Sequence, residues 1–559
     1  MPTITISYEA LKKELGKPLS IEELENGLFD MGMELDSVEG DDLAVEVTAE
    51  RLDLLSLQGL ARALKSFLGL SPNVPRYRTL QGDETYAVKI TDKVKQVRPF
   101  TVCAIVKNIQ FSEERIREVI DVQEKLHATL GRGRVRGAIG IYPLETIQLP
   151  ITYTADTPQN ISFVPLGETR EMTGAQILSQ HETGREYAHL LEGLDMYPYF
   201  VDAKGNILSM PPIINSEKTG RVENSTTDIF IECSGFDKIL LNELLTNLTT
   251  MFADMGGDIY EMTLKYESGE SEVTPNILSK KRSFSNKTLE KFIGLKLTLE
   301  ELKPLLRKMM YEFVDAEYKD NDEIILHVTA PAYREDIWHE IDIVEDIARA
   351  YGYNNLPLTF PNISTIGDTL PLSDLREELA TVMVGMGFLE TYTFGLTSKI
   401  DQLEHMLLDE QKVGFMPVAN GNETQTMMRI SLLPEQLKCL VHNRNQPLPQ
   451  RIFEGSFVII PDASKDVKCK NELHFAAAMT DKKVTFTQMR QALESLLKSK
   501  GLLPSFKPVE HPSFISGRAG VVIINNVAVG IIGEIHPQVL TNFGIVTPVV
   551  AFEINIEAI

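Results

Sequence analysis

The chain of 559 residues carries a formal net charge of −24 at pH 7, which argues against a protein that binds nucleic acid over its whole surface but leaves a local basic contact open. Its 43% hydrophobic and 24% charged content is typical of a soluble globular protein, and its length suggests about three to four domains. The sequence has neither a long apolar run nor a hydrophobic signal core, and its four cysteines lack CxxC spacing. These features predict a cytoplasmic protein with reduced thiols and no membrane contact.

Residues 1–70 are predicted to form a small first domain. The strand-like run TITISY precedes a capping box made by Ser20 and Glu23, which predicts the start of a short helix. A second strand, AVEVTA, leads into the helical stretch SLQGLARALKSFLGL. We interpret this segment as a packing unit and assign it no chemistry.

Residues 84–266 are rich in predicted strands, with alternating apolar runs such as AVKIT, FTVCAIVKNI and ISFVPL. Two helices are expected to interrupt them, near 113–130 and 240–255. Within this region the stretch GRGRVRG places three arginines in alternation, all on one side if the chain is extended: Arg132, Arg134 and Arg136. Two interpretations stay open here, a local basic contact and a solvated edge strand.

Residues 275–357 are predicted to be mainly helical. A capping box of Thr298 and Glu301 opens a helix with an apolar core stripe. A second helix is predicted further on, in the stretch APAYREDIWHEIDIVEDIARAYGYN. It has an apolar stripe on one face and four closely spaced acids on the other side, Asp336, Asp342, Glu345 and Asp346. Such hard oxygen ligands suit Mg²⁺, whereas acids near a helix N-terminus can also be solvated charges that offset the macrodipole. Spacing alone leaves both interpretations open.

Residues 372–559 begin with a long amphipathic helix, SDLREELATVMVGMGF, and one further helix is expected at TFTQMRQALESLLKSKG. The remaining apolar runs predict strands in hairpin-like order: LETYTFGL, RIFEGSFVII, LHFAAAM, AGVVIIN, AVGIIGEI and VVAFEINIE. Many strands with few crossover helices predict an antiparallel sheet in an α+β domain.

Several of these stretches resemble the beta subunit of phenylalanyl-tRNA synthetase. The run NKTLEKFIGLKLTLEEL and the acid-rich helix resemble its B5 domain, and EVTAERLDLLSLQGLARAL resembles its B1 domain. LHATLGRGRVRGAIGIYPL, LSMPPIINS and TDIFIECSGFD resemble its B3/B4 editing domain, while HPSFISGRAG resembles its class II catalytic-like domain. The resemblance implies an α+β multidomain chain of the shorter archaeal and eukaryotic type. Its parts would be a B1-like domain at 1–70, a mixed editing domain at 84–266, a small helical B5-type domain at 275–357 and a catalytically silent antiparallel-sheet domain at 372–559.

The resemblance also implies partners and a cofactor. The beta subunit acts with an alpha subunit in an (αβ)₂ heterotetramer that charges tRNA(Phe), and the alpha subunit binds phenylalanine and ATP. In this family the four acids are assigned to a Mg²⁺ shared with the alpha subunit. No phosphate-facing arginine follows Glu454 in RIFEGSFVII, and FGIVTPVVAFEINIE has no glycine–arginine pair. Arg518 is the one remaining candidate and is interpreted as structural, so the C-terminal domain is expected to be inactive in ligation.

Editing, the hydrolysis of Tyr-tRNA(Phe), is the chemistry that the resemblance assigns to this chain. A pocket built for phenylalanine rejects an added hydroxyl only weakly, so a second site must require that hydroxyl through a buried acceptor. Glu232 matches the carboxylate that contacts the tyrosine hydroxyl in this family, with His127 nearby; by itself Glu232 would be interpreted as an exposed strand acid. The other residues expected at this cavity are Pro212, Asn215, Ser216, Ser234 and Asp237.

The chain shows no Ser–His–Asp order, so hydrolysis would depend on a positioned water, assisted by the substrate's own ribose hydroxyl. Two alternatives stay open: a stand-alone trans-editing hydrolase, and a structural scaffold subunit with an inactive pocket. The large C-terminal fold argues against the first, because a stand-alone editor would not need it. The relative rates of Tyr-tRNA(Phe) and Phe-tRNA(Phe) deacylation would test the second.

Overall fold

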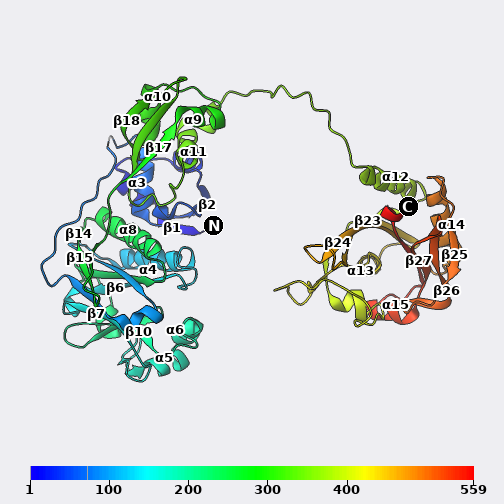
Figure 1. Cartoon of the computed structure of the whole chain (residues 1–559), viewed down its shortest axis with the longest axis horizontal. Coiled ribbons are helices and arrows are strands. Elements are labelled where there is room, and N and C mark those ends of the chain that lie inside the picture. Colours follow the sequence, from blue (N-terminus) through cyan, green and yellow to red (C-terminus); the bar gives the residue numbers. More distant parts are fainter. Residues whose placement is uncertain (1, 72) are drawn as a thin grey trace. The chain divides into compact units, whose positions relative to one another are not determined.

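The computed structural model describes residues 2–71 and 73–559 and divides into two compact units, Met1–Thr359 and Phe360–Ile559. Figure 1 draws unit 1 from blue to green and unit 2 from yellow-green to red. No helix in the described part of the chain is long and apolar enough to cross a membrane. Unit 1 contains three modules, and unit 2 is built around one large sheet.

The first module packs three helices against a three-stranded antiparallel sheet in the order β1-β3-β2. Its elements are β1 (Thr3–Ser7), α1 (Tyr8–Leu15), α2 (Ile21–Asp30), β2 (Glu34–Glu39), β3 (Asp42–Glu46) and α3 (Leu57–Phe67). The predicted capping box is confirmed, because the Ser20 hydroxyl accepts from the Glu23 N–H while the Glu23 carboxylate accepts from the Ser20 N–H. Helix α3 is buried along most of its length, as expected of a packing element.

The second module contains a four-stranded sheet that carries the site described below. Its order is β14 (Asp258–Tyr260), β5 (Phe100–Lys107), β13 (Ile229–Gly235) and β6 (Gly137–Pro143). Helix α8 (Lys238–Asp254) packs on β5 and β13, and helix α4 (Glu113–Ala128) lies against β6. Both helices were predicted from the sequence, within two residues at each end.

A seven-stranded sheet completes this module, in the order β12 (Ile214–Asn215), β11 (Ile207–Met210), β10 (Tyr197–Val201), β7 (Ile151–Asp156), β4 (Ala87–Ile90), β15 (Met262–Tyr266) and β16 (Ser271–Thr274). A small apolar cluster lies around the hairpin and helices that follow β7, namely β8 (Ser162–Phe163), β9 (Met172–Thr173), α5 (Gly174–Gln180), α6 (Glu182–Tyr187) and, later, α7 (Glu217–Gly220). Sequence analysis did not predict these short helices, because helices of one or two turns depend on tertiary packing.

The third module was expected to be small and helical, which is only partly right. Helices α9 (Asn286–Ile293), α10 (Leu299–Lys308) and α11 (Glu340–Tyr351) accompany a three-stranded antiparallel sheet. Its order is β17 (Lys280–Ser285), β19 (Ile324–Ala330) and β18 (Glu312–Tyr318). The alternating apolar residues of β19 explain the sheet, since one face of that strand is buried. The predicted capping box at Thr298 and Glu301 is confirmed.

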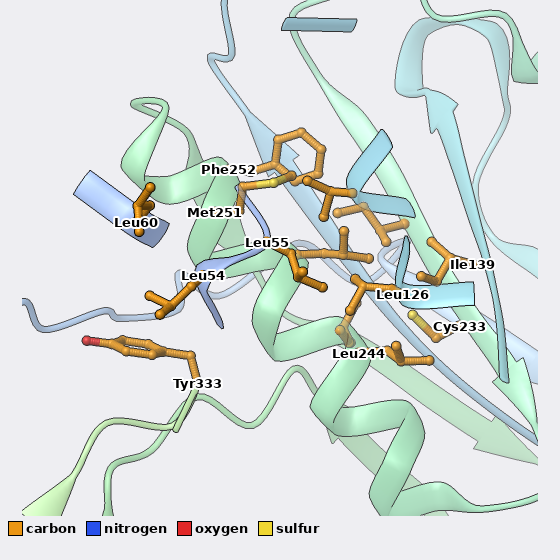
Figure 2. Close-up of a cluster of buried hydrophobic side chains, with 14 of the residues drawn as sticks. Leu54, Leu55, Leu60, Leu126, Ile139, Cys233, Leu244, Met251, Phe252 and Tyr333 are labelled. Carbon is orange, nitrogen blue, oxygen red and sulfur yellow. The ribbon is translucent and has the colours of Figure 1, made fainter. Parts of the chain in front are cut away.

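One continuous core joins the three modules of unit 1. Figure 2 shows Leu54, Leu55 and Leu60 of the first module beside Leu244 and Met251 of α8. Tyr333, from the segment between β19 and α11, belongs to the same buried cluster. The modules of unit 1 therefore share one apolar core, and buried side chains of strand β13 are part of it.

Unit 2 has a seven-stranded sheet in the order β20 (Leu389–Glu390), β23 (Gln450–Pro461), β24 (Cys469–Thr480), β28 (Val549–Asn555), β27 (Val527–Ile535), β26 (Phe514–Ile524) and β25 (Ser505–Pro508). All neighbours are antiparallel except β20, which runs parallel to β23. Helices α12 (Pro371–Gly385) and α14 (Phe486–Lys498) share one apolar cluster with the sheet. Helices α13 (Leu433–His442) and α15 (Pro537–Phe543) share the other.

The antiparallel sheet of unit 2 is thus confirmed in the main, with two corrections. The run LETYTFGL is not one strand, because only Leu389–Glu390 and Leu396–Thr397 (β21) pair, the latter with β22 (Met427–Met428). Between them Tyr392 and Phe394 are exposed, so apolar content did not indicate burial here. Helices α13 and α15 were not predicted as helices; a Pro lies at the start of each, a position that helices tolerate.

Candidate functional site

A cavity of about 530 Å³ opens in the second module of unit 1. Its walls come from α4, from the adjacent strand β6, from β13 and from the turn 211–215. Apolar side chains such as Ile116, Val119 and Ile139 line much of it, together with a few polar groups. This combination of an apolar wall and few polar groups is typical of a site for a small organic ligand or an amino-acid side chain.

Glu232 lies in the middle of this cavity wall and is only 2% exposed. Its strand, β13, is central in the four-stranded sheet, and the residue pairs with Cys103 on β5 and Gly140 on β6. A Cβ atom at Gly140 would lie 2.5 Å from Glu232 Oε1 and 2.3 Å from the Tyr142 hydroxyl. A glycine is therefore required at position 140 for the carboxyl group and the phenol to meet.

The two oxygens of Glu232 differ in their surroundings. The Tyr142 hydroxyl donates toward Oε1 at 3.1 Å and also lies 2.7 Å from Ser209 Oγ and 3.3 Å from Asn215 Oδ1. Oε2 is buried and has no hydrogen-bond partner among the described residues. Burial raises the pKa of Glu232 to about 8, because a low-dielectric site disfavours the charged form. The site therefore presents a largely neutral carboxyl group with one unused oxygen at neutral pH.

His127 also lines the cavity, but both of its ring nitrogens are engaged. The Ile139 N–H donates to Nε2 at 2.8 Å, so Nδ1 carries the proton and donates to Glu124 Oε1 at 3.2 Å. Burial lowers the pKa of His127 below its usual range, which favours this neutral form. The imidazole is consequently a fixed part of the wall and has no free nitrogen to act as a base.

The interpretation of GRGRVRG as an edge strand is wrong, because residues 131–136 form a turn and a bend before β6. Arg132 and Arg134 have left-handed φ angles of 48° and 66°, which separates their side chains. Arg134 lines the cavity, where it donates to the carbonyls of Pro212 and Ile213 at 3.3 and 3.1 Å. Its other amino group binds Glu124 at 3.0 Å. Arg136 is likewise paired with an acid, Asp237.

The predicted cavity residues separate into two groups. Pro212 and Asn215 line the cavity with Glu232. The other three predicted residues are not among those that line the cavity. Ser216 is the N-cap residue of the short helix α7, and the Ser234 hydroxyl oxygen accepts from Arg98 Nε at 3.2 Å. Asp237 caps helix α8 and binds Arg136 at 2.9 Å. Tyr142 and Ser209 were missed, because their approach to Glu232 depends on strand register, which the sequence does not reveal.

The four acids near α11 are divided between two environments. Asp346 is buried and Asp336 is half-buried, and the two share Arg334, whose Nη2 lies 2.7 Å from Asp336 and 2.6 Å from Asp346. The Tyr311 hydroxyl also donates to Asp346 at 2.7 Å. By contrast, Asp342 Oδ2 accepts from the N–H groups of residues 338 and 339, and Glu345 pairs with Arg349 at 2.7 Å. Each acid therefore has a protein partner, and Asp336 and Asp346 share theirs.

This arrangement does not fit the predicted Mg²⁺ site. A cation shared by all four acids would need their oxygens to converge, whereas the buried guanidinium of Arg334 lies between Asp336 and Asp346. Within residues 2–71 and 73–559, no group of three or more His, Cys, Asp and Glu side chains is arranged to hold a metal ion. The interpretation as solvated acids is also incomplete, because Asp346 is only 4% exposed.

In unit 2 the candidate residues for ligation chemistry have structural partners. Glu454 is fully buried on β23 and pairs with Arg429 at 2.9 Å. Arg429 also donates to the carbonyls of Thr393 and Phe457. Arg518 pairs with Glu534 at 2.5 Å. These contacts agree with the structural interpretation of Arg518.

Comparison with known proteins covers the whole chain. Family models match in sequence order: the Phe-tRNA synthetase beta subunit B1 domain (residues 1–70), the B3/4 domain (83–251), the tRNA synthetase B5 domain (282–353) and the phenylalanyl-tRNA synthetase beta chain CLM domain (356–556). The phenylalanine–tRNA ligase beta subunit of Pyrococcus abyssi is 38% identical over 99% of both chains. That of Archaeoglobus fulgidus is 37% identical over 100% of this chain and 98% of its own.

The chain belongs to the phenylalanine–tRNA ligase beta subunit family. A solved N-terminal fragment of the Pyrococcus horikoshii beta subunit matches 63% of this chain and 99% of its own length, with 36% identity and a TM-score of 0.59. Within the family models, Glu232 falls in the B3/4 domain, and the acids near α11 fall in the B5 domain. The beta-subunit family thus accounts for the order of the modules along the chain.

Proposed function

We propose that this chain works with an alpha subunit in an (αβ)₂ heterotetramer that charges tRNA(Phe), and that its unit 1 cavity hydrolyses Tyr-tRNA(Phe). One observation carries the editing proposal: Glu232 Oε2 is buried in a cavity wall and has no hydrogen-bond partner within the described part of the chain. An unpaired buried polar group costs free energy, and a ligand hydroxyl, which can donate or accept a hydrogen bond, removes that cost in either protonation state of the carboxyl group.

Selection would follow from this single oxygen. A tyrosyl side chain in the apolar cavity can place its hydroxyl on Oε2, whereas a phenylalanyl side chain leaves the same atom unpaired. An unsatisfied buried polar group costs about 1–3 kcal/mol, which corresponds to roughly 5- to 150-fold in rate or affinity. The effect has the direction that editing needs, because correctly charged Phe-tRNA(Phe) is the species that must survive.

Hydrolysis would rely on a positioned water. His127 has no free nitrogen, so it is unsuited to act as a general base. The ester of an aminoacyl-tRNA carries a neighbouring ribose hydroxyl, which can orient the attacking water. The cavity then contributes by holding the acyl group in place, which is a catalytic effect in itself.

Ligation is assigned to the alpha subunit. Amino-acid activation requires positive charge at the phosphates of ATP, usually from arginine and Mg²⁺. In unit 2 both Arg429 and Arg518 are held by carboxylates, Glu454 and Glu534. We therefore place phenylalanine, ATP and its accompanying Mg²⁺ on the alpha subunit.

The proposal is tested by deacylation assays with the purified alpha–beta complex. The complex should release tyrosine from Tyr-tRNA(Phe) much faster than phenylalanine from Phe-tRNA(Phe). Equal, slow release of both would support a scaffold subunit with an inactive cavity. Full editing by the beta chain without its partner would support a stand-alone trans-editing hydrolase.

A further inference from the structure

Tyr142 lies directly behind the cavity wall, next to Glu232. The residue is on β6, it is fully buried, and it does not line the cavity. Its ring packs against that of Phe230, with the two ring centroids 5.8 Å apart. Any effect of Tyr142 on a ligand in the cavity must therefore pass through a neighbouring side chain.

The phenol of Tyr142 is held by two strands of the other sheet. Its hydroxyl oxygen lies 2.7 Å from Ser209 Oγ on β11 and 3.3 Å from Asn215 Oδ1 on β12. Ser209 and Asn215 are paired across the β11–β12 ladder, whereas Tyr142 belongs to the four-stranded sheet. Burial raises the pKa of Tyr142 well above its ordinary value, so the phenol keeps its proton. A hydrogen-bond donor is thus fixed where the two sheets meet.

This donor meets only one oxygen of the Glu232 carboxyl group. The Tyr142 hydroxyl is 3.1 Å from Oε1, while Oε2 has no hydrogen-bond partner within the described residues. The last torsion of a glutamate side chain has broad energy wells, so a carboxyl group without an anchor turns easily. The hydrogen bond from Tyr142 restricts this rotation and leaves Oε2 as the oxygen without a partner.

We propose that Tyr142 is a positioning residue for the selection of tyrosine in the unit 1 cavity. It holds the Glu232 carboxyl group so that Oε2 stays unpaired until a ligand hydroxyl reaches it. This inference rests on the proposed editing function of the same cavity. A carboxyl group that is free to turn could place Oε2 on Ser209 or Asn215, and Oε2 would then be satisfied even beside a phenylalanyl side chain. The penalty against phenylalanine would fall, so selection depends on the phenol.

The test is Tyr142→Phe in the alpha–beta complex, because this substitution removes one oxygen and keeps the ring against Phe230. We compare kcat/KM for deacylation of Tyr-tRNA(Phe) with that for Phe-tRNA(Phe). The ratio should fall about 2- to 12-fold, which is the equivalent of one neutral hydrogen bond. Part of this change should be a faster release of phenylalanine, a result that a general loss of stability does not produce.

The matched control is Tyr153→Phe. Tyr153 is fully buried in the same module and does not line the cavity, and its hydroxyl donates to the Arg98 carbonyl at 2.8 Å. The control therefore loses a buried hydroxyl of the same kind and should keep the wild-type ratio. A wild-type ratio in Tyr142→Phe, or an equal fall in Tyr153→Phe, would overturn the proposal.

A second measurement does not require editing. Burial raises the pKa of Glu232 from 4.5 to about 8, while the Tyr142 hydrogen bond, the charge of Arg98 and the Ser234 hydroxyl lower it in part. Relative to Glu232→Gln, the stability of the wild type should therefore fall as pH rises from 4.5 and level off above about 8. In the Tyr142→Phe background, the same comparison by thermal unfolding should level off at a higher pH.

The two measurements separate this inference from the function on which it rests. If the pH dependence is the same in both backgrounds, the phenol does not hold the carboxyl group and the proposal is overturned. If the wild-type complex shows no preference for Tyr-tRNA(Phe), the proposed editing function fails, and with it the role of Tyr142 in selection. The pH dependence then still decides whether Tyr142 positions Glu232.

Discussion

The substitution Glu232→Ala tests the cavity most specifically, because it removes a buried oxygen of the cavity wall that has no hydrogen-bond partner among the described residues. Burial raises the pKa of Glu232 to about 8, so at pH 7 the lost interaction is mainly a neutral hydrogen bond within a desolvated site. The tyrosine hydroxyl would then be buried unsatisfied, at a cost of about 1–3 kcal/mol. We expect kcat/KM for Tyr-tRNA(Phe) deacylation to fall roughly 5- to 150-fold.

The assay compares deacylation of Tyr-tRNA(Phe) and Phe-tRNA(Phe) by the complex, together with phenylalanine charging. Charging should stay close to wild type, because the ligation chemistry is placed on the alpha subunit. The matched control is Glu114→Ala, which removes an exposed acid from α4, the helix that forms one cavity wall. If Glu232→Ala retains the wild-type preference for Tyr-tRNA(Phe), or if the control loses it equally, the selection argument is refuted.

Three further predictions concern stability. First, the pKa of Glu232 is raised from the ordinary glutamate value of 4.5 to about 8, so the free energy of unfolding of the wild type falls as pH rises through this range. Relative to wild type, Glu232→Gln should therefore gain up to about 5 kcal/mol of stability between pH 4.5 and 9, measured by thermal unfolding. A difference that does not depend on pH would contradict the burial argument. Second, Asp346→Asn should lower the free energy of unfolding by about 3–5 kcal/mol, because it weakens the buried ion pair with Arg334, and a thermal-shift assay should show the same loss with and without Mg²⁺. A loss of stability seen only with Mg²⁺ would support a metal site there. Third, Glu454→Gln should destabilise unit 2 by a similar amount through Arg429, while kcat for Tyr-tRNA(Phe) deacylation stays unchanged.

Much of the fold follows from local patterns. The capping boxes at Ser20 and Thr298 are signals contained within four residues, and both appear in the structure. Long helices such as α4 and α8 were equally predictable, because their length makes the periodic pattern visible. The short helices beside the cavity were not predicted, since packing rather than sequence pattern stabilises them.

The site was harder to predict than the fold. Glu232 was chosen by resemblance to a family, yet its burial depends on two neighbouring strands and on the small residue Gly140 opposite it. Tyr142 could not be connected with Glu232 without the register of β6 and β13. Ser234 lies two residues beyond Glu232; its oxygen accepts from Arg98, and its hydroxyl lowers the pKa of Glu232 against the effect of burial.

The acid cluster shows a related limit of sequence patterns. Spacing correctly placed Asp342, Glu345 and Asp346 on one helix, but it could not reveal which cation would lie nearest to them. Arg334 is only two residues from Asp336, and the turn before α11 directs its guanidinium toward both Asp336 and Asp346. A positive charge supplied by the chain itself thus pairs with two of the four acids for which a metal was predicted.

The most direct test of the central claim is a crystal structure of the complex with a non-hydrolysable tyrosyl-adenosine, in which an amide replaces the ester. The account predicts the tyrosyl ring in the unit 1 cavity, with its hydroxyl within about 2.5–3.0 Å of Glu232 Oε2. The Tyr142 hydroxyl should remain on Oε1. A tyrosyl group bound outside this cavity, or one whose hydroxyl points away from Glu232, would contradict the account.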